Sequence, residues 1–210
     1  MIHFFGDSFT YCQGCTSDHE YYKRTYDGTQ KTWIELMSEF LNDEYTNYGR
    51  PGISNQTIID ILIQNLKNIS SQDTVILCRG TDSRFKVPYS YPTGKPRFYE
   101  ILIHMFFEKL YPKGDFSNEY YETLANYIKN IWIPNLESVT DRYDILYNSF
   151  KEYFDVNNIK IIIWNLDENL LNKNGSVVHS IIAQEYDDID DSHWSWSGHT
   201  EFFNKIKKDI

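Results

Sequence analysis

Short apolar runs recur along the chain between longer segments in which apolar positions repeat every three or four residues. The runs are typical of buried strands, and they lie at residues 2–5, 74–78 and 160–164. Residues 44–48 are a plausible further strand, closed by a turn cluster at residues 49–52. The longer segments predict amphipathic helices at residues 32–41, after a cap at Ser54 or Asn55, and at residues 197–210. Because strands and helices alternate, the pattern indicates an α/β fold whose parallel strands are buried on both faces.

Residues 86–158 depart from this alternation. Their first part, residues 86–97, contains three prolines and one glycine, which predicts a loop. The remainder is rich in Tyr and Asn and has helical spacing. We interpret residues 86–158 as a loop and helical insertion between two core strands of a single domain that spans residues 1–210.

Composition and charge exclude several classes of protein. A formal charge of −10 repels phosphate backbones, so we expect no nucleic-acid partner. Aromatic residues make up 17% of the chain, which excludes a disordered protein. The longest purely apolar run, residues 161–164, is far shorter than the roughly 20 residues of a membrane span. No stretch resembles a signal peptide, so we expect the cytoplasm by default and leave delivery by another route open.

Three cysteines are too few, and odd in number, for a disulfide framework. Cys12 and Cys15 have the spacing of a redox pair or of half a zinc site. A structural zinc site needs a second pair of ligands, which the sequence does not offer. Packing, a labile disulfide and metal binding stay open for these two residues, with packing favoured, and we expect no bound metal.

Polar clusters follow the predicted strands, where the carboxyl ends of parallel strands meet at one edge and bind ligands. Ser8 lies in Gly-Asp-Ser directly after the first strand, and His193 lies near the C-terminus. A serine nucleophile needs a base, and a histidine base needs a carboxylate that orients it. Asp190 precedes His193 by three residues, so it can hold Nδ1 and leave Nε2 for the serine.

These clusters resemble, in order and nearly in spacing, the conserved blocks of the SGNH hydrolase superfamily, the GDSL esterases and lipases. The matching segments are Gly-Asp-Ser at residues 6–8, residues 47–52, Gly-Thr-Asp at residues 80–82 and residues 190–193. The resemblance covers residues 1–85 and 159–210. It implies a three-layer α/β/α sandwich with a flavodoxin-like parallel sheet.

The same resemblance implies the roles of individual residues. Ser8 would be the nucleophile, with Asp190 and His193 completing a catalytic triad. The backbone N–H groups of Ser8 and Gly52 would hold the oxyanion. Such a site needs neither a cofactor nor a metal.

Asp82 departs from the family pattern, which has an asparagine at this position. A carboxylate accepts hydrogen bonds and cannot donate one to an oxyanion. Asp82 is therefore protonated, or it turns away and binds Arg79 or Arg84, or the protein is a poor catalyst. We favour binding to an arginine, with Arg84 held near the site as a substitute electrophile that contacts substrate.

Two tryptophans, Trp194 and Trp196, flank the expected base. They belong either to the core under the last helix or to a wall on which a sugar ring or an acyl group stacks. We therefore expect a serine esterase acting on a small acyl ester, such as an O-acetylated carbohydrate. The alternative is a catalytically weak or inactive relative that binds carbohydrate or has a structural role. The sequence indicates neither the acyl group nor the oligomeric state.

Overall fold

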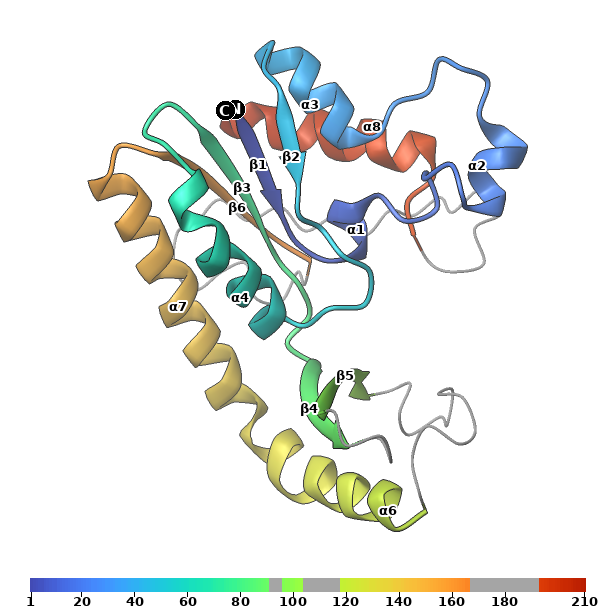
Figure 1. The fold of residues 1–210 in the computed structure, drawn as a ribbon, viewed down its shortest axis with the longest axis vertical. Coiled ribbons are helices and arrows are strands. Elements are labelled where there is room, and N and C mark those ends of the chain that lie inside the picture. Colours follow the sequence, from blue (N-terminus) through green and yellow to red (C-terminus); the bar gives the residue numbers. More distant parts are fainter. Residues whose placement is uncertain (91–95, 104–117, 167–192) are drawn as a thin grey trace.

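Four parallel strands form the central sheet of the computed structural model, which describes residues 1–90, 96–103, 118–166 and 193–210 (Figure 1). The strands are β1 (Ile2–Phe5), β2 (Tyr45–Asn47), β3 (Thr74–Arg79) and β6 (Lys160–Asn165), in the order β2-β1-β3-β6. Each neighbouring pair of strands is parallel. Counted along the chain, this is the order 2-1-3-4 of the flavodoxin-like sheet, so the predicted fold class is confirmed.

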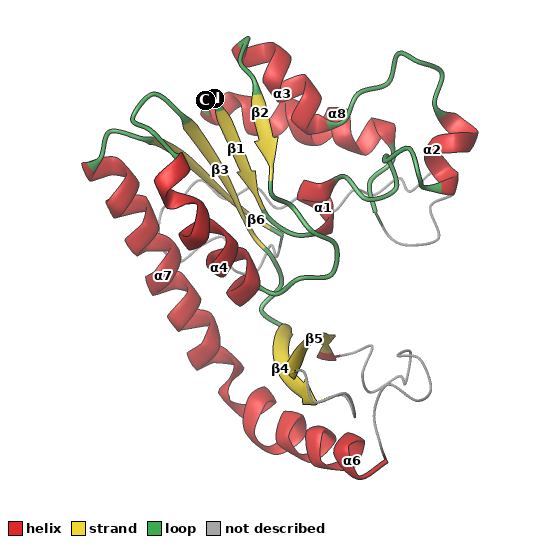
Figure 2. Cartoon of the chain, in the orientation of Figure 1, coloured by secondary structure: helices red, strands yellow, loops and turns green. Residues whose placement is uncertain are grey.

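Helices cover both faces of this sheet (Figures 1 and 2). One face carries α3 (Trp33–Leu41) and α8 (Trp196–Ile206), and the other carries α4 (Asn55–Asn65) and α7 (Leu136–Val156). The layers are therefore helix, sheet and helix. The remaining helical elements are α1 (Ser8–Tyr11), α2 (Glu20–Thr25), α6 (Asn118–Tyr127), a π-helix at Ile128–Trp132 and short 3₁₀ turns at Leu66–Asn68, Ile133–Asn135 and Lys207–Asp209.

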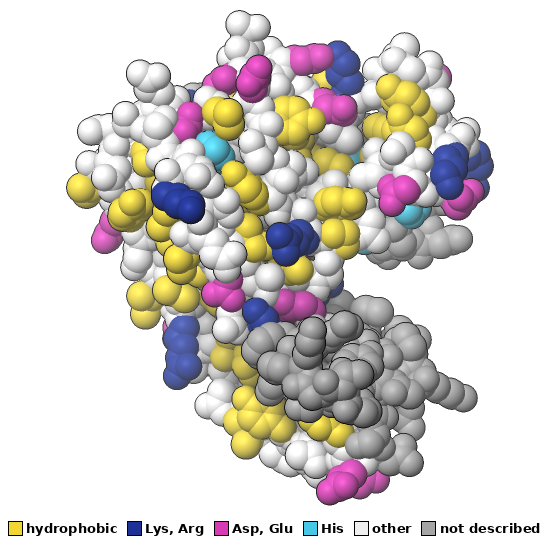
Figure 3. Space-filling view, viewed as in Figure 1, with side chains coloured by type: hydrophobic (Ala, Val, Ile, Leu, Met, Phe, Trp, Pro, Cys, Tyr) yellow, Lys and Arg dark blue, Asp and Glu magenta, His cyan; other side chains and the backbone are white. Residues whose placement is uncertain are grey.

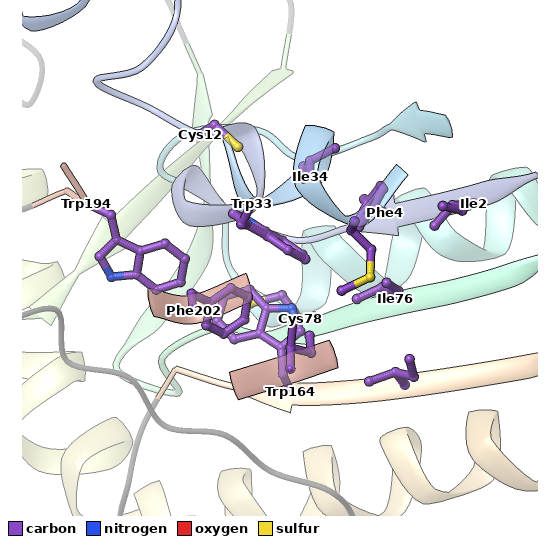
Figure 4. Packing of buried hydrophobic residues seen from close by; sticks show 13 residues of the cluster. Ile2, Phe4, Cys12, Trp33, Ile34, Ile76, Cys78, Trp164, Trp194 and Phe202 are labelled. Atoms are coloured by element: carbon purple, nitrogen blue, oxygen red, sulfur yellow. The ribbon is translucent and has the colours of Figure 1, made fainter. Parts of the chain in front are cut away.

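Alternation along the strands explains why both faces are covered. Successive side chains of a strand point to opposite faces, and in β1, β3 and β6 both sets are largely apolar and buried. The edge strand β2 departs from the expected burial, because its three residues are exposed or partly exposed. Phe4 and Ile76 enter the cluster formed with α3 and α8, which Figure 4 shows around Trp33 and Phe202. Their neighbours Phe5 and Leu77 enter the cluster formed with α4 and α7.

The helices begin where the sequence has its capping residues. Thr32 and Glu35 form a reciprocal capping box at the start of α3. The Ser54 side chain accepts a hydrogen bond from the backbone N–H of Thr57 (3.4 Å), so Ser54, not Asn55, caps α4. The predicted helices at residues 32–41 and 197–210 and the helix after Ser54 are confirmed.

The prediction of a loop over residues 86–97 was wrong. Strands β4 (Arg84–Ser90) and β5 (Pro96–Leu102) pair antiparallel, and residues 91–95 lie outside the described residues. Proline is tolerated here because each strand of a two-stranded ribbon has an unpaired edge, where a missing N–H breaks no ladder bond. Pairing of Arg84 with Leu102 is non-local, and local proline signals do not reveal it.

Much of the segment expected as an insertion belongs to the core. Tyr147 and Phe154 of α7 are buried in the cluster that α4 forms with the sheet. The segment that leaves the sandwich is the β4–β5 hairpin with α6, where Phe85 of β4 packs with Leu124. That the whole chain is one domain with an insertion stays a prediction.

The surface and the helices bear on possible partners. On the face in Figure 3, Lys and Arg side chains are scattered among Asp and Glu and do not gather into one patch. This distribution accords with a chain whose formal charge is −10. Among the described residues, no helix has both the length and the apolar character needed to cross a membrane.

Candidate active site

Ser8 is the first residue of α1 and follows β1 directly. The Asp7 carboxylate caps this turn by accepting a hydrogen bond from the N–H of Phe9 (3.1 Å). At Gly6, an added Cβ would lie 2.5 Å from the Cβ of Cys78 and would also collide with Thr10. Only glycine therefore lets the end of β1 pack against β3 in this way, which places Ser8 at the carboxyl edge of the sheet.

The loop after β2 is bonded to the turn that carries Ser8. Asn47 donates from Nδ2 to the carbonyl of Thr10 (2.9 Å), and its Oδ1 accepts from the N–H of Gly49 (2.8 Å). The N–H of Arg50 donates to the carbonyl of Gly6 (3.1 Å). Gly52 has φ +73°, a conformation that favours glycine. The two predicted blocks thus form one connected region at the sheet edge.

His193 lies beside the residue that follows Ser8. The centroids of the His193 and Phe9 rings are 5.0 Å apart, and the His193 side chain is partly buried. The segment before α8 is therefore brought to the turn that carries Ser8 from the far end of the sequence. Asp190 lies outside the described residues, so its role as the orienting carboxylate stays a prediction.

Asp7 shows that Arg84 also reaches this region. Burial raises the pKa of Asp7, and the charges of Arg84 and His193 and the N–H of Phe9 act in the opposite direction. The charges of two residues expected from the sequence, Arg84 and His193, therefore act on the residue that precedes Ser8.

Asp82 is not free to contact a substrate, because it is 5% exposed and its two oxygens already accept hydrogen bonds. Asn55 Nδ2 donates to Oδ1 (2.7 Å), and Arg79 NH2 donates to Oδ2 (2.8 Å). Arg79 also pairs with Asp144 of α7. The expectation that Asp82 turns away to bind an arginine is therefore confirmed, but the arginine is Arg79, and the preference for Arg84 was wrong. Arg79, at the end of β3, lies between Asp82 and Asp144. Because Asp144 is far along the chain, no local sequence pattern reveals this second partner.

Arg84 takes a different partner at the same edge. Its NH1 donates to the carbonyl of Ile53 (3.3 Å), the residue directly after Gly52. Arg84 is therefore held against the loop that carries Gly52, and its charge also acts on Asp7. A guanidinium has five N–H donors, so the bond to Ile53 does not use all of them.

Asn55 is a residue of this region that the sequence analysis considered only as a helix cap. It is fully buried at the start of α4, and its Nδ2 donates to the carbonyl of Gly80 (3.0 Å) as well as to Asp82. The Tyr147 hydroxyl lies 3.0 Å from its Oδ1. An amide directly after a serine cap, at the start of a helix with a buried apolar face, was the signal that could have found it.

The two tryptophans have different environments. Trp194 is 1% exposed and packs against Trp164, Phe202 and Phe9, so its ring offers no face to a substrate and belongs to the core (Figure 4). Trp196 is partly exposed, and its Nε1 donates to Thr25 of α2 (2.9 Å). Only Trp196 therefore remains as a candidate for contact with a ring-shaped group.

The cysteines are buried thiols without disulfide bonds. Burial raises the pKa of Cys12, so its thiol is a poor nucleophile and a poor metal ligand. Cys15 packs with Tyr21 and, through its Sγ, contacts the carbonyl of Trp194 (3.7 Å). In the part of the chain that the structure describes, no three His, Cys, Asp or Glu side chains converge on a possible metal position.

Comparisons with known proteins add a similarity in structure. No protein-family model and no curated protein matches the sequence. A crystal structure of a member of the lipolytic protein G-D-S-L family from Veillonella parvula is similar, with 18% sequence identity and a TM-score of 0.37, over 99% of this chain and 96% of that chain. The activity of this chain is therefore argued from its own residues.

Proposed function

We propose that this chain is a serine hydrolase of carboxylic esters, with Ser8 as nucleophile and His193 as general base. The observation that supports the proposal is that the centroid of the His193 ring lies 5.0 Å from that of Phe9, the residue directly after Ser8, at the carboxyl edge of the sheet. This edge lies between β1 and β3, where the strand order reverses and open α/β sheets bind their ligands.

In the proposed reaction, the Ser8 hydroxyl attacks the ester carbonyl carbon while His193 takes its proton. The tetrahedral intermediate collapses, and His193 gives that proton to the leaving alcohol. Water then attacks the acyl group on Ser8, again with His193 taking and returning a proton, which releases the acid and restores the serine. Asp190 is assigned the task of orienting His193.

The oxyanion is assigned to the N–H groups of Ser8 and Gly52 and to the guanidinium of Arg84. Arg84 takes the place of the side-chain amide that the family pattern provides, because the Asp82 carboxylate only accepts hydrogen bonds. A single oxyanion donor contributes about 10²–10³-fold in rate. Asp82 is assigned a positioning role, because its carboxylate holds the side chains of Arg79 and Asn55.

The proposed substrate is a small acyl ester, such as an O-acetylated carbohydrate. Ser8 is 5% exposed, which favours a small acyl group over a long chain. Trp196 offers a partly exposed ring of the kind on which sugar rings stack. The formal charge of −10 disfavours a polyanionic substrate.

One observation favours the alternative of a weak or inactive carbohydrate-binding relative: a carboxylate, Asp82, stands where the family pattern has an oxyanion donor. Turnover of p-nitrophenyl acetate by the wild type and by Ser8→Ala separates the two functions. The esterase predicts turnover that Ser8→Ala lowers by several orders of magnitude. Equal rates in the two proteins, combined with glycan binding, would support the alternative instead.

A further inference from the structure

The β4–β5 hairpin presents two different faces. Phe85 and Ile101, which are paired across the strands, point toward α6 and pack with Leu124 and Ile128. Because side chains alternate along a strand, Arg84, Lys86 and Glu100 point the other way, toward the start of α4. The hairpin thus has an apolar face that anchors it and a polar face that meets the loop carrying Gly52.

Polar contacts from the hairpin hold two consecutive residues of that loop. Arg84 NH1 donates to the carbonyl of Ile53 (3.3 Å), and the N–H of Ser54 donates to Oε2 of Glu100 (3.2 Å). The other carboxylate oxygen of Glu100 accepts a hydrogen bond from the Thr57 hydroxyl in the first turn of α4. Glu100 therefore bridges the end of the loop and the helix that follows it.

We propose that Glu100 is a positioning residue, whose carboxylate holds the Gly52 loop of the oxyanion site through Ser54 and Thr57. This inference rests on the proposed function. The loop needs such support because Gly52 has φ +73°, and an added Cβ there would meet no atom of the described residues within 4 Å, so their packing against Gly52 itself does not fix the turn. A displacement of about 1 Å in a group that orients the reaction can cost on the order of 10²-fold in rate.

The test compares variants that act on the same hairpin at different points. Glu100→Ala removes both contacts, whereas Glu100→Gln keeps an acceptor for Ser54 and an amide that can donate to Thr57. Asp60→Asn is the matched control, because Asp60 binds Lys86 of the hairpin (3.5 Å) and does not belong to the loop. Thr57→Val removes only one of the two Glu100 contacts.

With p-nitrophenyl acetate, we expect Glu100→Ala to lower kcat by about 10–100-fold with little change in KM. We expect Glu100→Gln to stay within about 3-fold of the wild type, Asp60→Asn to match the wild type, and Thr57→Val to fall in between. A purely structural role would lower the melting temperature of Glu100→Ala and leave kcat of the folded fraction unchanged, which would overturn the proposal.

Hydrogen exchange of a peptide covering residues 50–54 gives a second readout that does not depend on activity. We expect faster exchange in Glu100→Ala and in Thr57→Val than in the wild type, and unchanged exchange in Asp60→Asn. Equal exchange in all four proteins would overturn the proposal even in an active enzyme. Absence of turnover in the wild type would overturn the proposed function, whereas the exchange result would still decide whether Glu100 holds the loop.

Discussion

Arg79 and Asp82 form an ion pair inside the protein, with Arg79 NH2 2.8 Å from Oδ2 of Asp82 and each side chain 6% exposed. Burial alone lowers the pKa of Arg79, but the charges of Asp82 and Asp144 outweigh it, so the pKa of Arg79 is raised. The pair links the end of β3 to α7 and removes Asp82 from contact with a substrate. The presence of a carboxylate at position 82 is therefore explained by its hydrogen bonds to Asn55 and Arg79, and not by contact with an oxyanion.

Changing Asp82 should affect stability more than activity. Removing one member of a buried ion pair costs about 3–5 kcal/mol, and Asp144, which still neutralises Arg79, should keep the loss for Asp82→Ala near the lower end. Urea unfolding measures this change. Asp144→Asn is the control, and since Asp144 is more exposed, it should cost less.

Restoring the family residue with Asp82→Asn should not raise ester turnover. The side chain at this position is turned toward Asn55 and Arg79, so an amide there meets those partners and not the oxyanion. The rate with p-nitrophenyl acetate should stay at or below the wild-type rate. A gain of 10-fold or more, on the scale of a recovered oxyanion donor of about 10²–10³-fold, would show that Asp82 occupies the donor position.

Arg84→Ala should lower kcat by about 10²–10³-fold, because it removes the donor assigned to the oxyanion. Arg84→Lys should recover only part of the rate, since an ammonium keeps the charge and lacks the planar fork of donors. Lys86→Ala is the matched control, because Lys86 lies on the same strand and binds Asp60. Similar kcat values for Arg84→Ala and Lys86→Ala would contradict a role of Arg84 at the oxyanion.

His199 should make the protein less stable in acid. Burial lowers its pKa to about 3, with the charge of His193 acting in the same direction, whereas in an unfolded chain a histidine titrates near about 6.5. Between these values the unfolded state binds one more proton, so stability falls as the pH falls. The slope is at most about 1.4 kcal/mol per pH unit.

Urea unfolding between pH 7 and pH 4 tests this contribution in the wild type and in His199→Phe. Neither ring nitrogen of His199 has a hydrogen-bond partner among the described residues, so an apolar ring should be tolerated at pH 7. We expect a flatter pH dependence in the variant. Equal slopes in the two proteins would show that His199 takes up its proton in the folded state as readily as in the unfolded chain.

The sheet and the covering helices α3, α4 and α8 were predictable because their signals are local, whereas α7 was assigned to the insertion. Apolar runs such as Thr74–Arg79 and caps such as Thr32 and Ser54 lie within or next to the elements that they define. The hairpin was missed because prolines suggested a loop, while pairing between Arg84 and Leu102 joins residues far apart in the sequence.

The candidate site likewise contains residues with a local sequence signal and a contact that only the folded chain forms. Ser8 and His193 were selected because their residue types and positions suggest chemistry, and His193 does lie beside Phe9, the residue after Ser8, while their catalytic roles stay predictions. Arg79 was one of the two partners expected for Asp82, but the choice of Arg79 was not found, because Asp144, 65 residues away along the chain, holds Arg79 from the other side. No local pattern reveals the contact with Asp144.

Covalent labelling of the wild-type protein by a fluorophosphonate probe, located by peptide mass spectrometry, tests the central claim most directly. A fluorophosphonate reacts with a serine whose hydroxyl is activated by a neighbouring base. We expect the label on Ser8, with labelling slowed strongly in His193→Ala and abolished in Ser8→Ala. Label on another residue, or a folded wild-type protein that takes up no label, would contradict the assignment of Ser8 as the nucleophile.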